Sequence, residues 1–336
     1  MKTSSQFSLR PYNTFGIEAK ARHFIAFSSL EQLQEALEAY PREPLLILGG
    51  GSNILLTGDF NGLVIKNELK GIELVREDAG YYYVRTQAGE NWHGFVQYCI
   101  QHQYAGVENL SLIPGNVGAS PMQNIGAYGV EIKDVFHELE AWHIHEKKRY
   151  RFSVADCCFG YRESVFKKSL KGQFIILNVT FRLNKQPVFH TSYGAMENEL
   201  EKMQLKELSI QAISEAVIRI RSSKLPDPAA IGNAGSFFKN PVIPSEQYKH
   251  LLQQYPQMPG FAMDGSHTKI PAGWLIENTG WKGYREGDAG CYPKQALVLV
   301  NYGQATGHDI FHLSEKIISS IREKFGITLE REVNVI

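Results

Sequence analysis

The stretch LLILGGGSNILL, residues 45–56, carries the first indication of both fold and function. Two apolar runs flank a glycine turn and predict strand, turn and strand, because the eight residues from Gly49 to Leu56 leave no room for a helix. Consecutive glycines let backbone N–H groups approach a phosphate closely. The spacing is not that of a dinucleotide-binding fingerprint, since Ile54 stands where the third glycine would be, and the lysine of a P-loop is missing. On this loop alone, a plain tight turn is the favoured interpretation.

A second glycine-rich stretch, IPGNVGASPMQNIGAYG, occupies residues 113–129. Its four glycines and two prolines make a poor helix or strand. Such small residues would let the backbone lie against a flat, rigid ligand. An isoalloxazine ring fits this description, with the side-chain amides of Gln123 and Asn124 for its polar edge. An ordered surface loop explains the composition equally well.

Two further segments hold candidate reactive side chains. Arg162, in the segment GYRES, suits a cation held for an anionic ligand, or a surface arginine paired with its neighbouring carboxylate. Ser236, in GNAGSFFKNP, lies between a glycine and two phenylalanines, in surroundings that suit a tight, water-poor site, and Lys224 and Asn240 could serve a phosphate nearby. No nucleophile-elbow pattern surrounds the serine, so a hydrolase is unsupported, and a turn or helix-cap serine is the alternative.

Local patterns predict the elements around these segments. A helix starts at its cap Ser29 and stops before Pro41, and residues 63–182 have mostly β texture. A helical pattern over residues 214–223 ends before Pro226, and the last helix ends at Gly326. A terminal strand is predicted over residues 327–336, with Leu329, Arg331, Val333 and Val335 on one face.

Composition limits the class of protein. The 336 residues suggest two or three domains, and 43% apolar residues exclude a disordered chain. Lys and Arg number 35, as do Asp and Glu, so the zero net charge argues against a nucleic-acid or membrane-surface partner. The four cysteines have neither metal-ligand nor disulfide-framework spacing, so we expect reduced thiols and no metal. The sequence lacks a signal-peptide pattern and a long apolar run, and we expect a cytoplasmic protein.

In combination, these segments resemble one family, the UDP-N-acetylenolpyruvoylglucosamine reductases, or UDP-N-acetylmuramate dehydrogenases, of bacterial cell-wall synthesis. The resemblance starts at NTFG, residues 13–16, runs through both glycine-rich stretches, Tyr161-Arg162 and GNAGSFFKNP, and ends at Glu332. The segment HTSYG, residues 190–194, is similar to the tyrosine loop of the type I branch. The matches cover most of the chain in the order of the family.

The resemblance implies an α+β fold of three domains, two of which form a vanillyl-alcohol-oxidase-type (PCMH-type) FAD-binding fold beside a smaller α+β substrate domain. Residues 1–70 with 326–336 would form the first FAD-binding subdomain, 71–225 the second, and 226–325 the substrate domain. Two departures stand out. The sequence stops four residues after Glu332, so we expect a less firmly anchored last strand, and Phe261 stands where some relatives have tyrosine.

The resemblance also implies the site residues. The catalytic positions are Arg162, Ser236 and Glu332. The positions implied for FAD are Gly49, Gly50, Gly51, Ser52, Asn53, Pro114, Gly115, Gly118, Ala119, Gln123, Asn124, Gly126 and Ala127. The positions implied for the UDP-sugar are Tyr193, Lys224, Asn240, Lys269 and Gln295.

The implied reaction is the reduction of UDP-N-acetylglucosamine enolpyruvate to UDP-N-acetylmuramate in peptidoglycan precursor synthesis, by a monomer with non-covalent FAD and NADPH as hydride donor. Arg162 and Glu332 would stabilise the enolate and Ser236 would protonate it, while Tyr193 would close over the diphosphate from a mobile loop. Two alternatives stay open. One is another flavin oxidoreductase of the same fold, such as a carbohydrate oxidase, and the other is a non-catalytic nucleotide-sugar binding protein.

Overall fold

The computed structural model describes residues 3–205 and 207–336. Its contacts divide the chain into two compact units. The first unit comprises residues 3–7, 21–50 and 61–223, and the second comprises residues 8–20, 51–60 and 224–336. One boundary therefore falls inside the first glycine loop, between Gly50 and Gly51. The three-domain division remains a prediction.

The first unit contains a sheet of strand order β1–β2–β5–β3, in which β3 runs parallel to β5. Helix α1 (Leu30–Ala39) follows β2, and its cap is as predicted: the Ser29 hydroxyl accepts the N–H of Gln32. Leu33 and Ala36 are fully buried among the apolar residues of this sheet. The strand bounds are β1 (Ser4–Ser8), β2 (Lys20–Phe27), β3 (Leu45–Leu48) and β5 (Phe60–Asn67).

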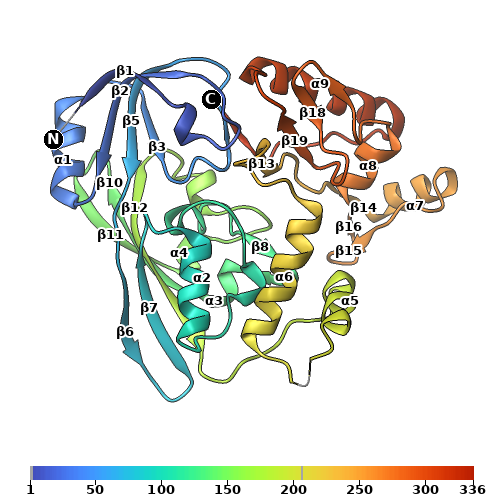
Figure 1. Cartoon of the computed structure of the whole chain (residues 1–336), viewed down its shortest axis with the longest axis horizontal. Coiled ribbons are helices and arrows are strands. Elements are labelled where there is room, and N and C mark those ends of the chain that lie inside the picture. The colour runs from blue at the N-terminus through green and yellow to red at the C-terminus, as the bar shows by residue number, and fades with distance from the viewer. Residues whose placement is uncertain (1–2, 206) are drawn as a thin grey trace. The chain divides into compact units, whose positions relative to one another are not determined.

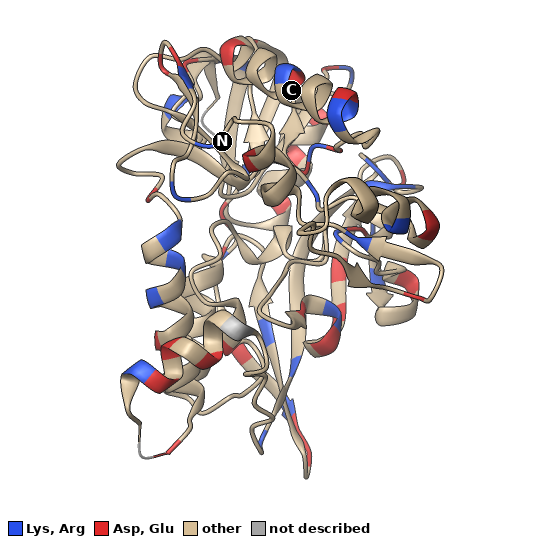
Figure 2. Ribbon diagram, turned by 90° about the vertical axis from the view of Figure 1, so that its right-hand side faces the viewer, with Lys and Arg blue, Asp and Glu red and all other residues tan. Residues whose placement is uncertain are grey.

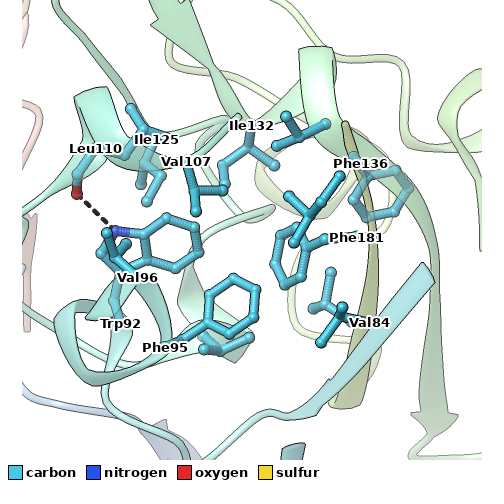
Figure 3. Packing of buried hydrophobic residues seen from close by; sticks show 14 of the residues in the cluster. Val84, Trp92, Phe95, Val96, Val107, Leu110, Ile125, Ile132, Phe136 and Phe181 are labelled. Carbon is cyan, nitrogen blue, oxygen red and sulfur yellow. Dashed lines mark hydrogen bonds between the residues drawn. The ribbon is translucent and has the colours of Figure 1, made fainter. Parts of the chain in front are cut away.

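A second, antiparallel sheet of the same unit has the order β11–β10–β12–β7–β6 and confirms the predicted β texture. Helix α2 (Trp92–Gln101) was not predicted. The Asn91 side chain caps it, and its Trp92 and Phe95 pack against Phe181 (Figure 3). The strand bounds are β6 (Ile72–Glu77), β7 (Tyr81–Gln87), β10 (Phe136–His143), β11 (Lys148–Ser153) and β12 (Phe174–Asn184).

Short elements and two helices complete the first unit. The predicted helix over residues 214–223 is confirmed as part of α6 (Ile210–Lys224). Helix α5 (Gly194–Met203) was not predicted, and its Met196 packs on Ile213 and Val217 of α6. The short elements are η2 (Glu108–Leu110), η3 (Val117–Ala119), β8 (Gly126–Ala127), β9 (Val130–Glu131), α3 (Ile132–Val135), α4 (Val154–Cys157) and η4 (Val165–Lys167).

The second unit contains the sheets β13–β19–β18–β17 and β14–β16–β15 (Figure 1). Its long helix α9 (Gly307–Phe325) begins at a Thr306 capping box and ends at Gly326, whose φ of 65° is the left-handed cap expected from the sequence. The other bounds are η1 (Arg10–Tyr12), β13 (Gly232–Ser236), β14 (Val242–Pro244), α7 (Ser245–Gln254), β15 (Phe261–Ala262), β16 (His267–Lys269), α8 (Ala272–Asn278), β17 (Arg285–Glu286), β18 (Ala289–Cys291) and β19 (Val298–Asn301).

The predicted terminal strand is largely wrong. Only β20 (Asn334–Val335) is a strand, parallel to β4 (Ile54–Leu55), and Val335 is 39% exposed whereas Leu329 and Val333, predicted on the same face, are buried. The expected weak anchoring is also wrong, because Ile336 donates its N–H to Leu55 at 2.9 Å and accepts the N–H of Thr57 at 2.7 Å. Residues 330–332 exchange backbone hydrogen bonds with residues 237–239, whereas residues 334–336 bond to residues 53–57. Because two different segments pair with the chain end, neither forms a long ladder of hydrogen bonds with it.

Charged side chains of both signs are interspersed along the ribbon rather than gathered in one segment (Figure 2). This mixture agrees with the zero net charge. Within the described part of the chain, no helix combines the length and the apolar character needed to cross a membrane.

Candidate active site

The first glycine loop has free backbone donors. Among the described residues, the N–H groups of Gly50, Gly51 and Ser52 have no hydrogen-bond acceptor, although the Gly51 carbonyl accepts the N–H of Thr14 at 3.1 Å. Gly51 has a φ of 63°, and a Cβ there would lie 1.9 Å from the Tyr12 carbonyl oxygen, so only glycine fits. Consecutive unpaired N–H groups form the kind of concave nest that binds an anion such as a pyrophosphate. The loop therefore fits the phosphates of FAD.

The second glycine-rich stretch lies against the first loop. A Cβ on Gly50 would come within 2.7 Å of the Gly115 Cα, so the two backbones approach as only glycines allow. The N–H groups of Val117 and Gly118 donate to the carbonyls of Glu90 and Ala88. These contacts fix the stretch as an ordered platform, and its small residues Pro114 and Ala119 are exposed upon it. Such a surface fits the flat face of a flavin.

Arg162 lies in a tight turn at the edge of this stretch. Gly160 and Glu163 exchange backbone hydrogen bonds, and Arg162 between them has a left-handed φ of 55°. Its Nη2 donates to the Gly126 carbonyl at 2.5 Å, and a Cβ on Gly126 would lie 2.9 Å from its Nη1. The guanidinium is therefore held at one place on the β8–β9 hairpin, at the cost of a backbone conformation that arginine rarely adopts.

Asn124 organises this turn. It is fully buried, and its Nδ2 donates to the Gly160 carbonyl and to Glu131 Oε2, each at 3.0 Å. Its Oδ1 accepts the N–H of Lys133 at 3.1 Å. The side chain is thus occupied within the protein, and the amide that we predicted for the polar edge of a flavin is not available for that role. Gln123, its neighbour, is only partly buried.

Ser236 follows a β-bulge in the second unit. The β13–β19 register jumps between Asn233 and Ser236, and Gly235 in the bulge has a φ of 69°. The hydroxyl of Ser236 has no partner among the described residues, and the side chain is exposed. Phe237 and Phe238 are buried in the core of their unit, so they do not form the water-poor surroundings that we expected. The bulge instead directs an unpaired hydroxyl outward.

Glu332 lies on the extended segment beside Ser236. Its N–H donates to the Phe237 carbonyl at 2.8 Å, and Phe238 pairs with Arg331 in an antiparallel bridge. The Glu332 carbonyl also accepts Asn53 Nδ2 at 3.3 Å. The second unit thus brings together the predicted catalytic Ser236 and Glu332 with the end of the first glycine loop.

The predicted UDP-sugar residues fall into separate groups. Asn240 and Gln295 meet at the start of α8: Asn240 Oδ1 accepts the Ala272 N–H at 2.9 Å, and Gln295 Oε1 lies 3.3 Å from a Cβ built on Gly273. Lys269 pairs across the sheet with Phe261, which is 56% exposed.

The other two lie at helix ends. Tyr193 is exposed directly before α5, at the end of a segment without regular secondary structure as expected, and its ring meets that of Tyr128 edge-on at 5.7 Å. Lys224 is exposed at the last position of α6.

Comparisons with known proteins identify the family. The profile of the UDP-N-acetylenolpyruvoylglucosamine reductase C-terminal domain matches residues 227–336, and that of an FAD-binding domain matches residues 21–144. A UDP-N-acetylenolpyruvoylglucosamine reductase of Flavobacterium johnsoniae is 50% identical over 337 residues, which is 100% of both chains. The enzyme of that name from Amoebophilus asiaticus is 51% identical over 338 residues, again 100% of both. The chain belongs to the UDP-N-acetylenolpyruvoylglucosamine reductase family.

Solved structures give the same fold. The UDP-N-acetylenolpyruvylglucosamine reductase of Thermus caldophilus has a TM-score of 0.70 at 24% identity, covering 99% of this chain and 98% of its own. The 4-ethylphenol oxidase of Gulosibacter chungangensis has a TM-score of 0.51 at 12% identity, covering 94% of this chain and 82% of its own. The predicted α+β, FAD-binding fold class is confirmed for this member of the reductase family.

Sequence reasoning missed several groups that shape this reductase-family site. Asn109 joins the Tyr128 and His190 carbonyls, at 3.0 and 2.8 Å, and so ties the Tyr193 segment to the β8–β9 hairpin. No sequence pattern indicated it. Arg221 could have been found, because it falls on the apolar stripe of α6, at helical spacing from Ile213 and Val217. A charged side chain on the buried face of a helix is unusual, so the position of Arg221 indicates a functional or structural role.

Proposed function

We propose that this chain is an FAD-containing oxidoreductase that reduces UDP-N-acetylglucosamine enolpyruvate to UDP-N-acetylmuramate with NADPH. The observation that carries the proposal is 50% identity over the whole chain to a reductase named for this substrate. The unpaired N–H groups of the first glycine loop support the binding of FAD. Because the product is UDP-N-acetylmuramate, the enzyme would act in the synthesis of peptidoglycan precursors, and through it in cell shape and cell division.

Within this proposal, the bound FAD would accept a hydride from NADPH and supply it to the terminal carbon of the enolpyruvyl group. Gly49–Asn53 would hold the FAD pyrophosphate by backbone N–H groups, and the platform of Pro114, Gly115, Gly118, Ala119, Gly126 and Ala127 would support the flavin, with Gln123 at its edge. Non-covalent attachment follows from the lack of an evident attachment side chain in either stretch.

Arg162 would stabilise the negative charge that develops on the substrate after hydride addition. A guanidinium is charged at every physiological pH and can bind both oxygens of a carboxylate. The hydrogen bond to the Gly126 carbonyl fixes its position before substrate arrives, which is the condition for electrostatic stabilisation to be effective.

Ser236 would give the proton that completes the reduction, with Glu332 as an acid or hydrogen-bond partner for the enolate. A hydroxyl is a weak acid, but an enolate conjugated with a carboxylate is a strong base, so the transfer is downhill. The exposed, unpaired hydroxyl at the bulge supports this role, because no intrachain bond must break first. Tyr193, Lys224, Asn240, Lys269 and Gln295 would bind the UDP-sugar.

The proposal is tested on the purified protein. We expect visible flavin absorption, release of the flavin by acid or heat, and NADPH oxidation that depends on UDP-N-acetylglucosamine enolpyruvate. Oxygen consumption without NADPH would favour a carbohydrate oxidase, and a colourless protein that still binds UDP would favour a non-catalytic binding protein. Either result would overturn the proposal.

The cellular setting and assembly form part of the same proposal. We expect the enzyme in the cytoplasm, where its nucleotide substrates are, and we expect it to act as a monomer. Sedimentation of the purified protein tests the monomer, and fractionation of cells tests the location.

A further inference from the structure

Lys66 is a half-buried cation beside the start of the first glycine loop. Strands β3 and β5 lie side by side (Figure 1), and Lys66 of β5 is the register partner of Leu48, the last residue of β3. Its Nζ donates to the carbonyl of the next residue, Gly49. Among the described residues no carboxylate forms an ion pair with it, and burial lowers the pKa of its ammonium group. Lys70, by contrast, is exposed and pairs with Glu90 at 3.4 Å.

The hydrogen bond from Lys66 sets the direction of the first peptide group of the loop. The Gly49–Gly50 peptide bond is trans, so the carbonyl of Gly49 and the N–H of Gly50 point in opposite directions. Because Lys66 binds the carbonyl, the N–H of Gly50 points away from the lysine. That N–H has no acceptor among the described residues. Lys66 therefore fixes the direction of one free donor of the loop.

The positive charge of Lys66 exceeds what this hydrogen bond requires. A neutral side-chain donor, such as an amide, could satisfy the Gly49 carbonyl without the cost of removing a charge from water. An ammonium group also polarises the peptide group, because hydrogen bonds in series strengthen one another where the dielectric constant is low. The N–H of Gly50 thereby becomes a stronger donor, and the lysine attracts any anion bound there. The charge thus indicates an anion at the Gly50 N–H.

We infer that Lys66 is a positioning residue for the pyrophosphate of FAD and acts through the Gly49–Gly50 peptide group, which it orients and polarises. The inference rests on the proposed binding of FAD at this loop. The alternative is a purely structural lysine, which only completes the hydrogen bonding at the end of β3. The two roles differ in one respect: a positioning lysine matters for a flavin that carries a pyrophosphate, and not for a flavin that lacks one.

Binding of two flavins to the protein freed of its own flavin tests the inference without turnover. FAD and riboflavin present the same ring, but riboflavin has no phosphate. In Lys66→Met the dissociation constant for FAD should rise by about tenfold or more, because the pyrophosphate loses both an oriented donor and a nearby charge. The dissociation constant for riboflavin should change by less than about twofold. Fluorescence titration measures both, and equal weakening of the two flavins would overturn the inference.

Two further variants separate the charge of Lys66 from its hydrogen bond, and a third is the control. Lys66→Arg keeps both and should bind FAD nearly as the unchanged protein does. Lys66→Gln offers a neutral donor to the Gly49 carbonyl and should recover only part of the loss, so full recovery would contradict the inference. Lys70→Met removes an exposed lysine that also binds a glycine carbonyl, that of Gly89 at 2.6 Å, and should leave FAD binding unchanged. An equal loss in Lys70→Met would show that the effect is not specific to Lys66.

A failure of the proposed function would look different. If the unchanged protein binds no FAD, both the proposal and the inference fall, and no variant is needed. If it binds FAD and Lys66→Met does not fold, Lys66→Gln and Lys66→Arg still decide, because both keep a donor for the Gly49 carbonyl. Equal affinity of these two variants for FAD would overturn the inference, and weaker binding by Lys66→Gln alone would support it.

Discussion

Replacing Asn124 tests how the Arg162 turn is held. Asn124→Ala removes hydrogen bonds to the Gly160 carbonyl, Glu131 and the Lys133 N–H, each worth about 1 kcal/mol net when buried. Alanine at the left-handed φ of 45° adds about 1 kcal/mol of strain. We therefore expect the free energy of unfolding to fall by about 4 kcal/mol, measured by urea denaturation.

Glycine separates the two contributions. Asn124→Gly loses the same side-chain bonds but tolerates the backbone conformation, so about 1 kcal/mol of the loss should return. Asn278→Ala, which removes an exposed amide bonded to the Trp274 carbonyl, is the control and should change stability by less than about 0.5 kcal/mol.

Activity completes the test. With the Gly160 carbonyl released, the Arg162 turn loosens, and kcat should fall in both Asn124 variants while the folded protein retains its flavin. A loss of stability below about 1 kcal/mol would refute the account of the buried hydrogen bonds. An unchanged kcat together with a large loss of stability would refute the claim that Asn124 positions Arg162 through the Gly160 carbonyl.

Three other predictions concern separate groups. Ser236→Ala should leave flavin reduction by NADPH intact and slow the reaction with the enolpyruvyl substrate roughly 100- to 10,000-fold, with partial recovery in Ser236→Cys; stopped-flow kinetics that show both half-reactions equally slowed, or neither, would make Ser236 structural. Tyr193→Phe should raise the KM for the UDP-sugar at unchanged flavin content, and an unmoved KM would remove Tyr193 from the diphosphate. Burial raises the pKa of Glu108, whose Oε2 accepts the Gly106 N–H, so the protonated carboxyl stabilises the fold at low pH and this contribution is lost as pH rises through the raised pKa. The melting temperature of Glu108→Gln should therefore increase relative to that of the unchanged protein as pH rises from acid to neutral, and a constant difference between the two would contradict this.

The sequence predicted what local patterns control. The Ser29 cap, the Gly326 stop and the turn between β3 and β4 each depend on residues within a few positions, and all three are confirmed. Helix α2 was also within reach, because Asn91 is a good cap and apolar residues follow it at helical spacing. This helix was not predicted because the sequence on both sides of it has the composition of β-strands.

The remainder depends on contacts between distant positions. Asn124 meets Gly160 across 36 residues, and no local pattern states that its amide is used there rather than for a ligand. The bulge before Ser236 follows from the register of β13 on β19, which the sequence of β13 alone does not contain. The terminal segment failed as a strand because two different partners share it.

That shared segment also governs the order in which the protein can be made. The Thr57 hydroxyl bonds the Ile336 carbonyl across 279 positions, so residues 51–60 have only their contacts with residues 8–20 of the second unit while the ribosome is still translating the intervening chain. Residues 61–223 are contiguous and belong to one unit, so they can collapse during synthesis. The second unit closes only after translation of residues 330–336, and contacts of such high contact order form slowly. Gly51–Asn53 and Glu332 are therefore joined late, and nascent chains should gain the cofactor only after release.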